Sequence, residues 1–290
     1  MTLRYFVKAV QTRYWMPGSN YLDIIVSALK DKLNDGDIVL VSEKALAVAR
    51  RLIVDESRVK PGLLARFLAC FWMRIIWGFF LGRICRLKEE NIWRLRNYPV
   101  KEGSAHKQVV LWYANFLQAL HWGSEGGIDG SNLPFAYVSL PLKDPQSVAE
   151  EIRLYLKNLL RKEVTVIIVD TDKTYSLGSF HFTHRPVSID GIHSFFGVIA
   201  YIVGRALRLK RRATPLAVSG AKIDIEYALD LAEAAHRARG SGAGRTVWDM
   251  AERFGVDLTG VSWEMLKGIS HKPIVVIRPC DSRFRLGSES

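Results

Sequence analysis

Short apolar runs alternate with longer amphipathic stretches along most of this chain. Residues 3–10, LRYFVKAV, look like a first strand, and residues 164–169, VTVIIV, are a β-branched run typical of a buried strand. Residues 21–33 have the apolar spacing of a helix, and a last strand, PIVVIRP, is expected at 273–279. Because strands and helices interleave from end to end, the pattern predicts a mixed α/β fold.

Turn and capping residues mark several of the boundaries. NDGD at 34–37 predicts a turn, after which IVLVSEKALAVARR reads as a buried strand running into a helix. Asp144 and Pro145 suit the N-cap and the first position of another helix. Gly240 suits the end of a later helix, IEYALDLAEAAHRAR.

Two segments are more apolar than the rest. IHSFFGVIAYIVGRALRL at 192–209 predicts a single helix, and residues 61–85, PGLLARFLACFWMRIIWGFFLGRIC, have apolar residues on every helical face. The second segment is interrupted by three arginines that do not share one face: Arg66, Arg74 and Arg83. It therefore reads as a buried helix, or a helical hairpin turning near Gly78, with a helix lying at a membrane interface as the alternative.

The chain is basic, and the charge is concentrated. The net charge is +12, and residues 58–107 hold eleven Lys and Arg against three Glu, which is +8 of that total. Such an excess favours a polyanionic partner, namely a nucleotide, RNA or an anionic membrane surface, docking through residues 58–122. A basic solvated surface is the competing interpretation.

Cysteine content and the N-terminus indicate an intracellular protein. The three cysteines lack CxxC spacing, so we expect buried thiols and neither a disulfide framework nor a structural zinc site: Cys70, Cys85 and Cys280. The first residues, MTLRYFVKAVQTRYW, contain no signal-peptide apolar block. A cytoplasmic location follows, with peripheral membrane association as an addition.

Two acidic segments carry the clearest chemistry. Residues 123–132, GSEGGIDGSN, combine glycines with Glu125 and Asp129, and Asp170-Thr171-Asp172 follow the buried run VTVIIV. Glycine lets backbone N–H groups approach phosphate oxygens, and carboxylates at a strand end suit Mg²⁺ or Mn²⁺. A surface turn and a strand-ending Asx turn are the alternatives, and neither a P-loop nor a Rossmann fingerprint is present.

Two further groups are weaker candidates. HFTH contains His181 and His184, which would face opposite ways in a strand, so packing is favoured over metal binding; Arg185 beside them could contact an anionic substrate. RARGSGAGR at 237–245 places arginines around a glycine-rich turn, and Arg245 could contact phosphate or a carboxylate. Solvated arginines on a mobile loop explain that pattern equally well.

The motifs together resemble the coenzyme F420-0 gamma-glutamyl ligase family. GGIDGSN resembles the family's AGIDxSN loop, VTVIIVDTD its strand followed by Asp and Thr or Ser, and DGDIVLVSEKALAVA its DGDVLVVxSKVVSKAEG segment. The helix LDLAEAA and the final PIVVIRP also fit. The resemblance implies one ligase-like unit over 1–290, with an inserted or divergent helical segment at about 58–122 and a divergent segment at about 242–266.

The resemblance also implies an activity. A family member would use GTP and Mn²⁺ or Mg²⁺ to phosphorylate a carboxylate, and the amine of L-glutamate would attack the acyl phosphate. The acceptor is open, with coenzyme F420-0 among the candidates, and a homodimer is expected.

Residue by residue, the match assigns three groups of positions. The implied metal site is Asp129, Asp170 and Thr171, and the implied nucleotide contacts are Ser42, Lys44, Gly127, Ser131 and Asn132. Further substrate or phosphate contacts are expected at Glu125, Asp172, Lys173, Arg185 and Arg245.

Several positions depart from the family pattern. Val48 stands where the family has a second lysine, Glu125 where it has an asparagine, and Lys173-Thr174 where it has Gly-Arg. These changes keep a second hypothesis open. In it, the chain is a catalytically degenerate nucleotide-binding protein that docks on RNA, a ribonucleoprotein or a membrane surface through its basic aromatic region.

Overall fold

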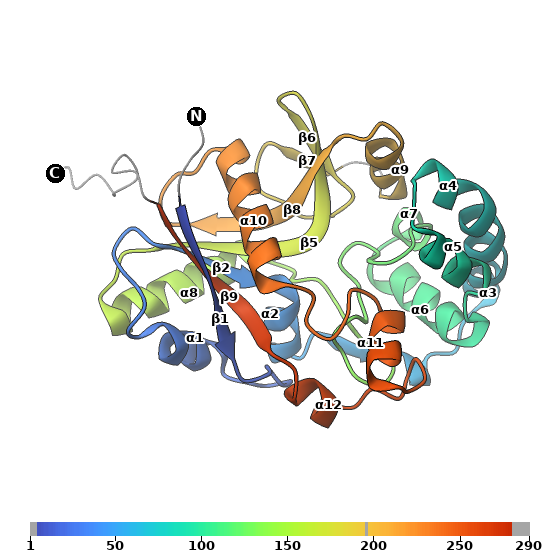
Figure 1. Ribbon diagram of the computed structural model, residues 1–290, viewed down its shortest axis with the longest axis horizontal. Helices are drawn as coiled ribbons and strands as arrows, with labels where there is room; N and C mark the ends of the chain where they lie inside the picture. Colours follow the sequence, from blue (N-terminus) through green and yellow to red (C-terminus); the bar gives the residue numbers. More distant parts are fainter. Residues whose placement is uncertain (1–4, 195–196, 280–290) are drawn as a thin grey trace.

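A seven-stranded mixed sheet forms the centre of the molecule (Figure 1). The computed structural model describes residues 5–194 and 197–279. The strands of the main sheet are β1 (Tyr5–Thr12), β2 (Ile38–Ser42), β5 (Thr165–Leu177), β6 (Phe180–Thr183), β7 (Ile192–Ser194), β8 (Lys210–Ser219) and β9 (His271–Pro279). A separate two-stranded sheet pairs β3 (Ile53–Asp55) with β4 (Tyr137–Ser139).

The main sheet has the order β1-β9-β2-β5-β6-β7, and β8 pairs with β5. β2 runs parallel to the first half of β5, and β6 runs antiparallel to its second half. We expected this strand to end before Asp170, but β5 continues to Leu177. Its register against β8 shifts between Asp170 and Lys173, so these polar residues occupy an irregular stretch inside a strand rather than a turn after one.

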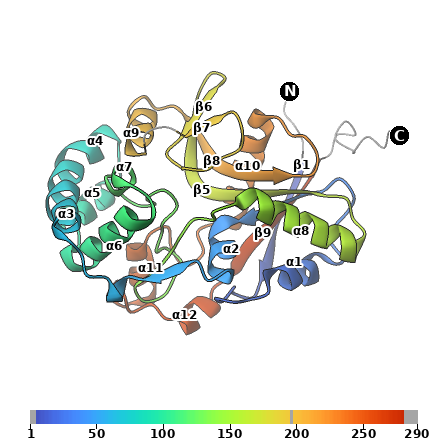
Figure 2. The same cartoon turned by 180° about the vertical axis from the view of Figure 1, so that it is seen from behind.

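Helices cover both faces of the sheet. α10 (Ile225–Arg239) lies on the face seen in Figure 1; α1 (Tyr21–Leu29) and α8 (Pro145–Leu160) lie on the face seen in Figure 2, where α2 (Glu43–Ala49) also packs. Alternation along β2 explains these two layers, since Ile38 and Leu40 pack toward α10 while Val39 and Val41 pack toward the other helices. The predicted α/β class is confirmed.

A cluster of helices stands beside the sheet at one end of the molecule (Figure 1). It comprises the short 3₁₀ turn η1 (Glu56–Arg58), α3 (Leu63–Phe67), the π-helix η2 (Leu68–Leu81), α4 (Gly82–Ile84), α5 (Glu89–Arg96), α6 (Val100–Tyr113) and α7 (Phe116–Ala119). Its core contains Met73, Trp77, Ile92 and Leu95. Further helices are α9 (Val198–Ala206), α11 (Val247–Phe254) and α12 (Trp263–Lys267).

Residues 63–84 form one helix, in contrast to the predicted hairpin. The chain stays helical through Gly78, where the missing side chain lets α5 approach: a Cβ there would lie 2.9 Å from Cγ of Arg96. The expectation of a buried helix is also wrong for half of its surface. Trp77 and Met73 are buried, while Phe67 and Phe71 are exposed.

The remaining boundaries divide into agreements and corrections. The capping roles of Asp144, Pro145 and Gly240 are confirmed. The apolar segment at 192–209 is not one helix, since it begins as β7 and its helix, α9, starts only at Val198. Of the cysteines, Cys85 is buried as expected and Cys70 is exposed; Cys280 lies outside the described residues.

Candidate active site

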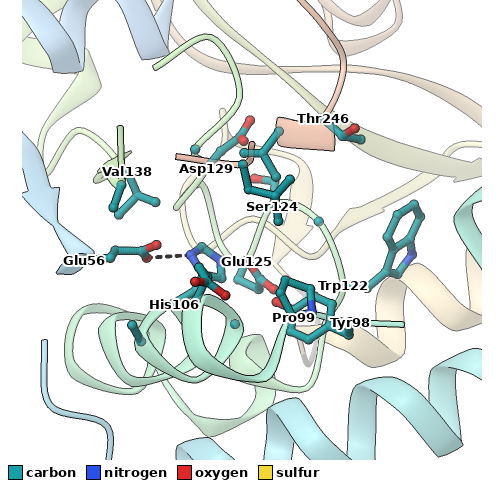
Figure 3. Close-up of a pocket in the computed structure, with 18 of the residues that line it drawn as sticks. Glu56, Tyr98, Pro99, His106, Trp122, Ser124, Glu125, Asp129, Val138 and Thr246 are labelled. Atoms are coloured by element: carbon teal, nitrogen blue, oxygen red, sulfur yellow. Dashed lines mark hydrogen bonds and ion pairs between the residues drawn. The ribbon is translucent and has the colours of Figure 1, made fainter. Parts of the chain in front are cut away.

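A cavity of about 1160 Å³ separates the helical cluster from the irregular stretch of β5. The glycine-rich loop contributes Ser124, Glu125 and Asp129 to its wall. Thr171, Asp172 and Lys173 from β5 also line it, as do residues 98–106 of the helical cluster. Figure 3 shows Ser124 and Asp129 together with His106 and Tyr98 of the helical cluster. The two acidic segments singled out in the sequence therefore meet at one cavity.

Lys44 joins the glycine-rich loop to the first turn of α2. Its ammonium forms an ion pair with Asp129 and donates to the hydroxyl of Ser131 at 2.7 Å. Asp129 also accepts from the backbone N–H of Ser131 at 2.7 Å, which holds the loop in a tight Asx turn. Ser42 caps the same helix without a side-chain hydrogen bond. The structure thus brings Lys44, Ser131 and Asp129 together.

Asp170 is buried beside Arg185. Its Oδ1 accepts from the N–H of Thr171 at 2.6 Å, and its Oδ2 lies 3.3 Å from Nε of Arg185. Within the described residues, that Oδ2 has no hydrogen-bond donor. Burial and the neighbouring charge of Asp172 raise the pKa of Asp170, against the opposing effects of Arg185 and Lys44.

Asp172 lies against a histidine. Its Oδ2 accepts from the hydroxyl of Ser124 at 2.9 Å and lies 3.3 Å from Nε2 of His184. Burial acts to raise its pKa, but His184 and Ser124 outweigh burial, so the pKa of Asp172 is lowered and the group stays ionised. A carboxylate and an imidazole therefore face each other at the cavity wall, the arrangement of a general base and its orienting partner.

Arg185 serves the interior rather than the surface. Its side chain is 1% exposed and donates hydrogen bonds of 2.7 and 2.8 Å to the two carboxylate oxygens of Glu43. Burial, opposed by Arg185, raises the pKa of Glu43 to about 7. The guanidinium also packs on the glycine-rich loop, where a Cβ at Gly127 would lie 1.4 Å from its Nη1. Gly127 is required both for that contact and for its φ of +98°.

Glu125 is held by the helical cluster. Its Oε1 accepts from Nζ of Lys107 at 2.7 Å, and its Oε2 bonds to Nε2 of His106. The other ring nitrogen of His106 lies 2.7 Å from Oε1 of Glu56, as drawn in Figure 3. Both oxygens of Glu125 are engaged and the residue is 1% exposed, so its geometry favours holding the loop over contacting a phosphate.

Sequence reasoning missed Glu56 and the adjacent pair His106 and Lys107, which lie 50 or more positions from it and meet it only in the folded protein. It also missed His121, whose ring stacks on that of His184 with centroids 4.8 Å apart. Burial, with the nearby positive groups His184 and Lys107, lowers the pKa of His121 well below the usual value. No local motif marks any of these residues.

The remaining predicted positions are Asn132, Arg245 and Lys173. Asn132 accepts from the N–H of Ala243 at 2.6 Å and donates to the carbonyl of Gly244 at 2.9 Å, which ties the loop to residues 241–245. Arg245 lines the cavity. Lys173 also lines it, with its ammonium paired to Glu233 at 2.8 Å.

His181 bonds to Ser176 at 2.9 Å, apart from the Asp172–His184 pair. The described residues contain no group of three or more His, Cys, Asp or Glu arranged to hold a metal ion. Asp129, which lines the cavity, and Asp170, which precedes Thr171 of the cavity wall, nevertheless provide oxygen donors that suit a hard divalent cation. Asp170 offers an unbonded carboxylate oxygen, and the carboxylate of Asp129 is balanced in this structure by Lys44.

The two segments that the sequence analysis expected to diverge from the family contact each other. Arg94 of α5 bonds to Asp249 of α11 at 2.7 Å, and the rings of Tyr98 and Trp248 lie 6.1 Å apart. Tyr98 and Trp248 both line the cavity. Together these segments form much of the wall that faces the glycine-rich loop and β5.

Comparison with known proteins agrees with this architecture. The family model described as F420-0:Gamma-glutamyl ligase matches residues 9–278. The chain is also 34% identical over 284 residues to "Uncharacterized protein MJ1361" of Methanocaldococcus jannaschii, an alignment covering 93% of this chain and 94% of that protein. The match includes both segments that the sequence marked as divergent. From its sequence and the length of this match, the chain belongs to the F420-0:gamma-glutamyl ligase family.

Proposed function

We propose that this protein is a GTP- and divalent-metal-dependent gamma-glutamyl ligase that forms an amide bond through an acyl phosphate. One observation carries the proposal. Asp129 lines the cavity together with Thr171, Asp172 and Lys173, and it is bonded to Lys44 and Ser131. Family membership supplies the ligase class, and this constellation supplies cationic, hydroxyl and carboxylate groups of the kinds that phosphoryl transfer uses.

The proposed reaction has two steps. A carboxylate oxygen of the acceptor attacks the γ-phosphorus of GTP, the bond to the bridging oxygen breaks, and GDP leaves. The amine of L-glutamate then attacks the acyl carbon of the mixed anhydride, the carbon–oxygen bond breaks, and inorganic phosphate leaves. The amine gives up one proton as the amide forms.

The residues divide between these steps. Asp129, Asp170 and Thr171 would hold Mg²⁺ or Mn²⁺, which supplies charge neutralisation to the triphosphate when bound. Lys44, with Ser131 and Gly127, would contact the phosphates, and Ser42 and Asn132 would lie near the nucleotide. Lys173 and Arg245 would contact the anionic parts of the substrates from the rim.

His184 is the group best placed to accept the proton of the amine. It is buried at the cavity wall, its Nε2 faces Asp172, and Asp172 stays ionised. The carboxylate would orient the imidazole and stabilise its protonated form. His184 was treated as a packing residue in the sequence, and its partner could not be seen there.

The substrates of this proposal are GTP, L-glutamate and a carboxylate acceptor, with coenzyme F420-0 among the acceptors to be tried. A cytoplasmic homodimer remains the expected form. The acceptor would occupy the part of the cavity toward Tyr98 and Trp248, where aromatic rings line the wall.

The test is a calorimetric titration with GTP in the presence and absence of Mn²⁺. We expect metal-dependent binding that Asp129→Asn and Asp170→Asn weaken at least about tenfold, while the exposed Asp190→Asn leaves it unchanged. Release of GDP and phosphate should then require both L-glutamate and an acceptor. Absence of nucleotide binding at millimolar Mn²⁺ would overturn the proposal, and metal-dependent binding without turnover would favour the nucleotide-binding hypothesis.

The variant His184→Gln tests whether His184 acts as the general base without contributing to nucleotide binding. We expect it to keep GTP affinity within a factor of about two and to lower the amide-forming rate by about a hundredfold. Equal loss of nucleotide affinity would assign His184 to binding instead.

A further inference from the structure

The long helix over residues 63–84 carries an unusual exposed surface. Its most apolar 18-residue window has a mean hydropathy of 1.6, yet only a third of that window is buried in the fold. The exposed side chains form what we call the apolar face: Leu63, Leu64, Phe67, Phe71, Ile75, Phe79, Phe80 and Ile84. Soluble monomers rarely expose so many large apolar side chains in one place, so this face calls for a partner.

The winding of the helix keeps this face together. Exposed positions recur every four residues from Leu63 to Phe79, and buried positions recur every four from Ala65 to Trp77. Four residues are close to one helical turn, so each set of positions forms a continuous stripe along the helix.

The opposite side of the helix is anchored in the protein. Trp77 is fully buried, and Nε1 of Trp77 donates to the carbonyl of Leu120 at 2.7 Å. Arg74 donates to the carbonyl of Tyr98 at 2.9 Å, and Arg96 to that of Gly78 at 2.9 Å. A helix attached along its length in this way cannot cross a bilayer without unfolding the cluster, so its exposed side can only be applied to a surface.

The charge around the apolar face has one sign. Residues 58–88 contain seven Lys and Arg and neither Asp nor Glu. Arg66 and Arg83 are exposed near the two ends of the helix, and Arg86 and Lys88 are exposed just after it. A second copy of the chain on this face would bring two such basic groups together, which disfavours self-association.

We propose that the apolar face docks the protein on an anionic lipid bilayer, with the helix lying in the plane of the interface. Its Leu, Ile and Phe side chains enter the boundary between headgroups and acyl chains, while the arginines extend to lipid phosphates. RNA fits less well, because Leu63, Leu64, Ile75 and Ile84 offer aliphatic contacts that bases do not use. Val59, Pro61 and Arg66 also line the cavity, so docking would hold that cavity near the membrane.

Vesicle sedimentation of the full chain tests the proposal. We expect binding to vesicles of phosphatidylcholine with phosphatidylglycerol, weaker binding as salt rises, and little binding to phosphatidylcholine alone. Phe71→Ser with Phe79→Ser should weaken binding by about a hundredfold. Arg66→Gln with Arg83→Gln should weaken it by about tenfold or more.

A matched control uses exposed apolar residues elsewhere. Leu159→Ser with Leu177→Ser removes side chains of similar exposure from α8 and β5, and binding should stay unchanged. Circular dichroism and unfolding midpoints establish that each variant is folded. Loss of binding in the control pair equal to that in the phenylalanine pair would overturn the proposal.

Cys70 reports on the same face directly. It is an exposed thiol on the π-helical stretch, so an environment-sensitive fluorophore can be attached there in a Cys280→Ser background. Anionic vesicles should shift its emission to the blue and protect it from an aqueous quencher. Three results would overturn the proposal: no vesicle binding at low salt, a dimer that Phe71→Ser with Phe79→Ser dissolves, or RNA binding that the arginine pair abolishes.

Discussion

Lys107 and Glu125 form an ion pair in the interior, with Nζ and Oε1 2.7 Å apart and the two side chains 0% and 1% exposed. Lys107 belongs to α6 of the helical cluster, and Glu125 to the glycine-rich loop at the cavity. His106 and Glu56 complete a group of two positive and two negative charges when His106 is protonated. The loop of the candidate active site is therefore attached to the cluster by a neutral buried network.

Removing one charge should be costly, and removing two should cost less. Lys107→Met leaves an uncompensated buried carboxylate and should lower the free energy of unfolding by about 3 kcal/mol. Lys107→Met with Glu125→Gln restores neutrality and should recover part of that loss. Chemical denaturation of both variants measures this, with the exposed Lys101→Met on the same helix as a control. Additive effects of the two substitutions would show that the pair is not coupled.

The same network predicts a dependence of stability on pH. Burial acts to lower the pKa of His106, but Glu125 and Glu56 outweigh it, so the pKa lies well above the usual value. A raised folded-state pKa gives stability that is complete below the unfolded value and is lost as pH rises through the folded one. The difference in stability between wild type and the less stable His106→Gln should therefore be largest near pH 6 and decrease under alkaline conditions.

Thermal unfolding of wild type and His106→Gln between pH 6 and pH 10 measures that difference. Comparing the two proteins at each pH removes the contribution of Lys107, whose pKa burial lowers. His193→Gln, at an exposed histidine, is the control. A constant difference over the whole range would mean that His106 does not carry its proton in the network.

A comparison of Gly127 with Gly123 distinguishes the stability cost of backbone strain from the cost of a steric clash. Both have positive φ, +98° and +90°, but a Cβ at Gly123 meets nothing within 4 Å, whereas one at Gly127 meets Arg185. Gly123→Ala should cost about 1 kcal/mol from strain alone. Gly127→Ala should cost at least about 2 kcal/mol more and weaken GTP binding, because Arg185 must move. Equal costs in denaturation would contradict the contact.

The variant Arg185→Lys tests whether stability requires the planar guanidinium or only a positive charge. The guanidinium of Arg185 holds both oxygens of Glu43 and lies beside Asp170, which a lysine ammonium cannot do at once. Arg185→Lys should lower the free energy of unfolding by about 2 kcal/mol, and Arg237→Lys, at an exposed ion pair, should change it by less than about 0.5 kcal/mol. Unchanged stability in Arg185→Lys would show that a positive charge is sufficient.

Local pattern predicted much of the fold and the two acidic segments, because strands, caps and the loop motif depend on neighbours in sequence. The prediction failed where tertiary contacts determine the secondary structure. Asp170 and Asp172 disfavour strand, yet β8 pairs on both sides of them and carries β5 to Leu177. The wrong expectation for 192–209 has a related cause, since Ile192 begins a strand that pairs with β6.

The partners of Glu125 show a second limit of prediction from sequence, since they come from a distant part of the chain. The sequence marks this residue as a departure from the family asparagine and as an expected substrate or phosphate contact, and nothing near it indicates a base or a cation. His106 and Lys107 reach it from α6, so the negative charge of Glu125 is balanced by residues of that helix. A change in the loop is thus explained only by the helices that pack on it.

The contact between the helical cluster and residues 242–266 has a consequence for how this family diversifies. The bond from Arg94 to Asp249 and the pairing of Tyr98 with Trp248 join these two segments into one structural unit. Selection for a new acceptor can remodel that unit while leaving Lys44, Asp129 and Ser131 untouched. Paralogues should then differ together at both segments, and their chemistry should be inherited while their substrates change.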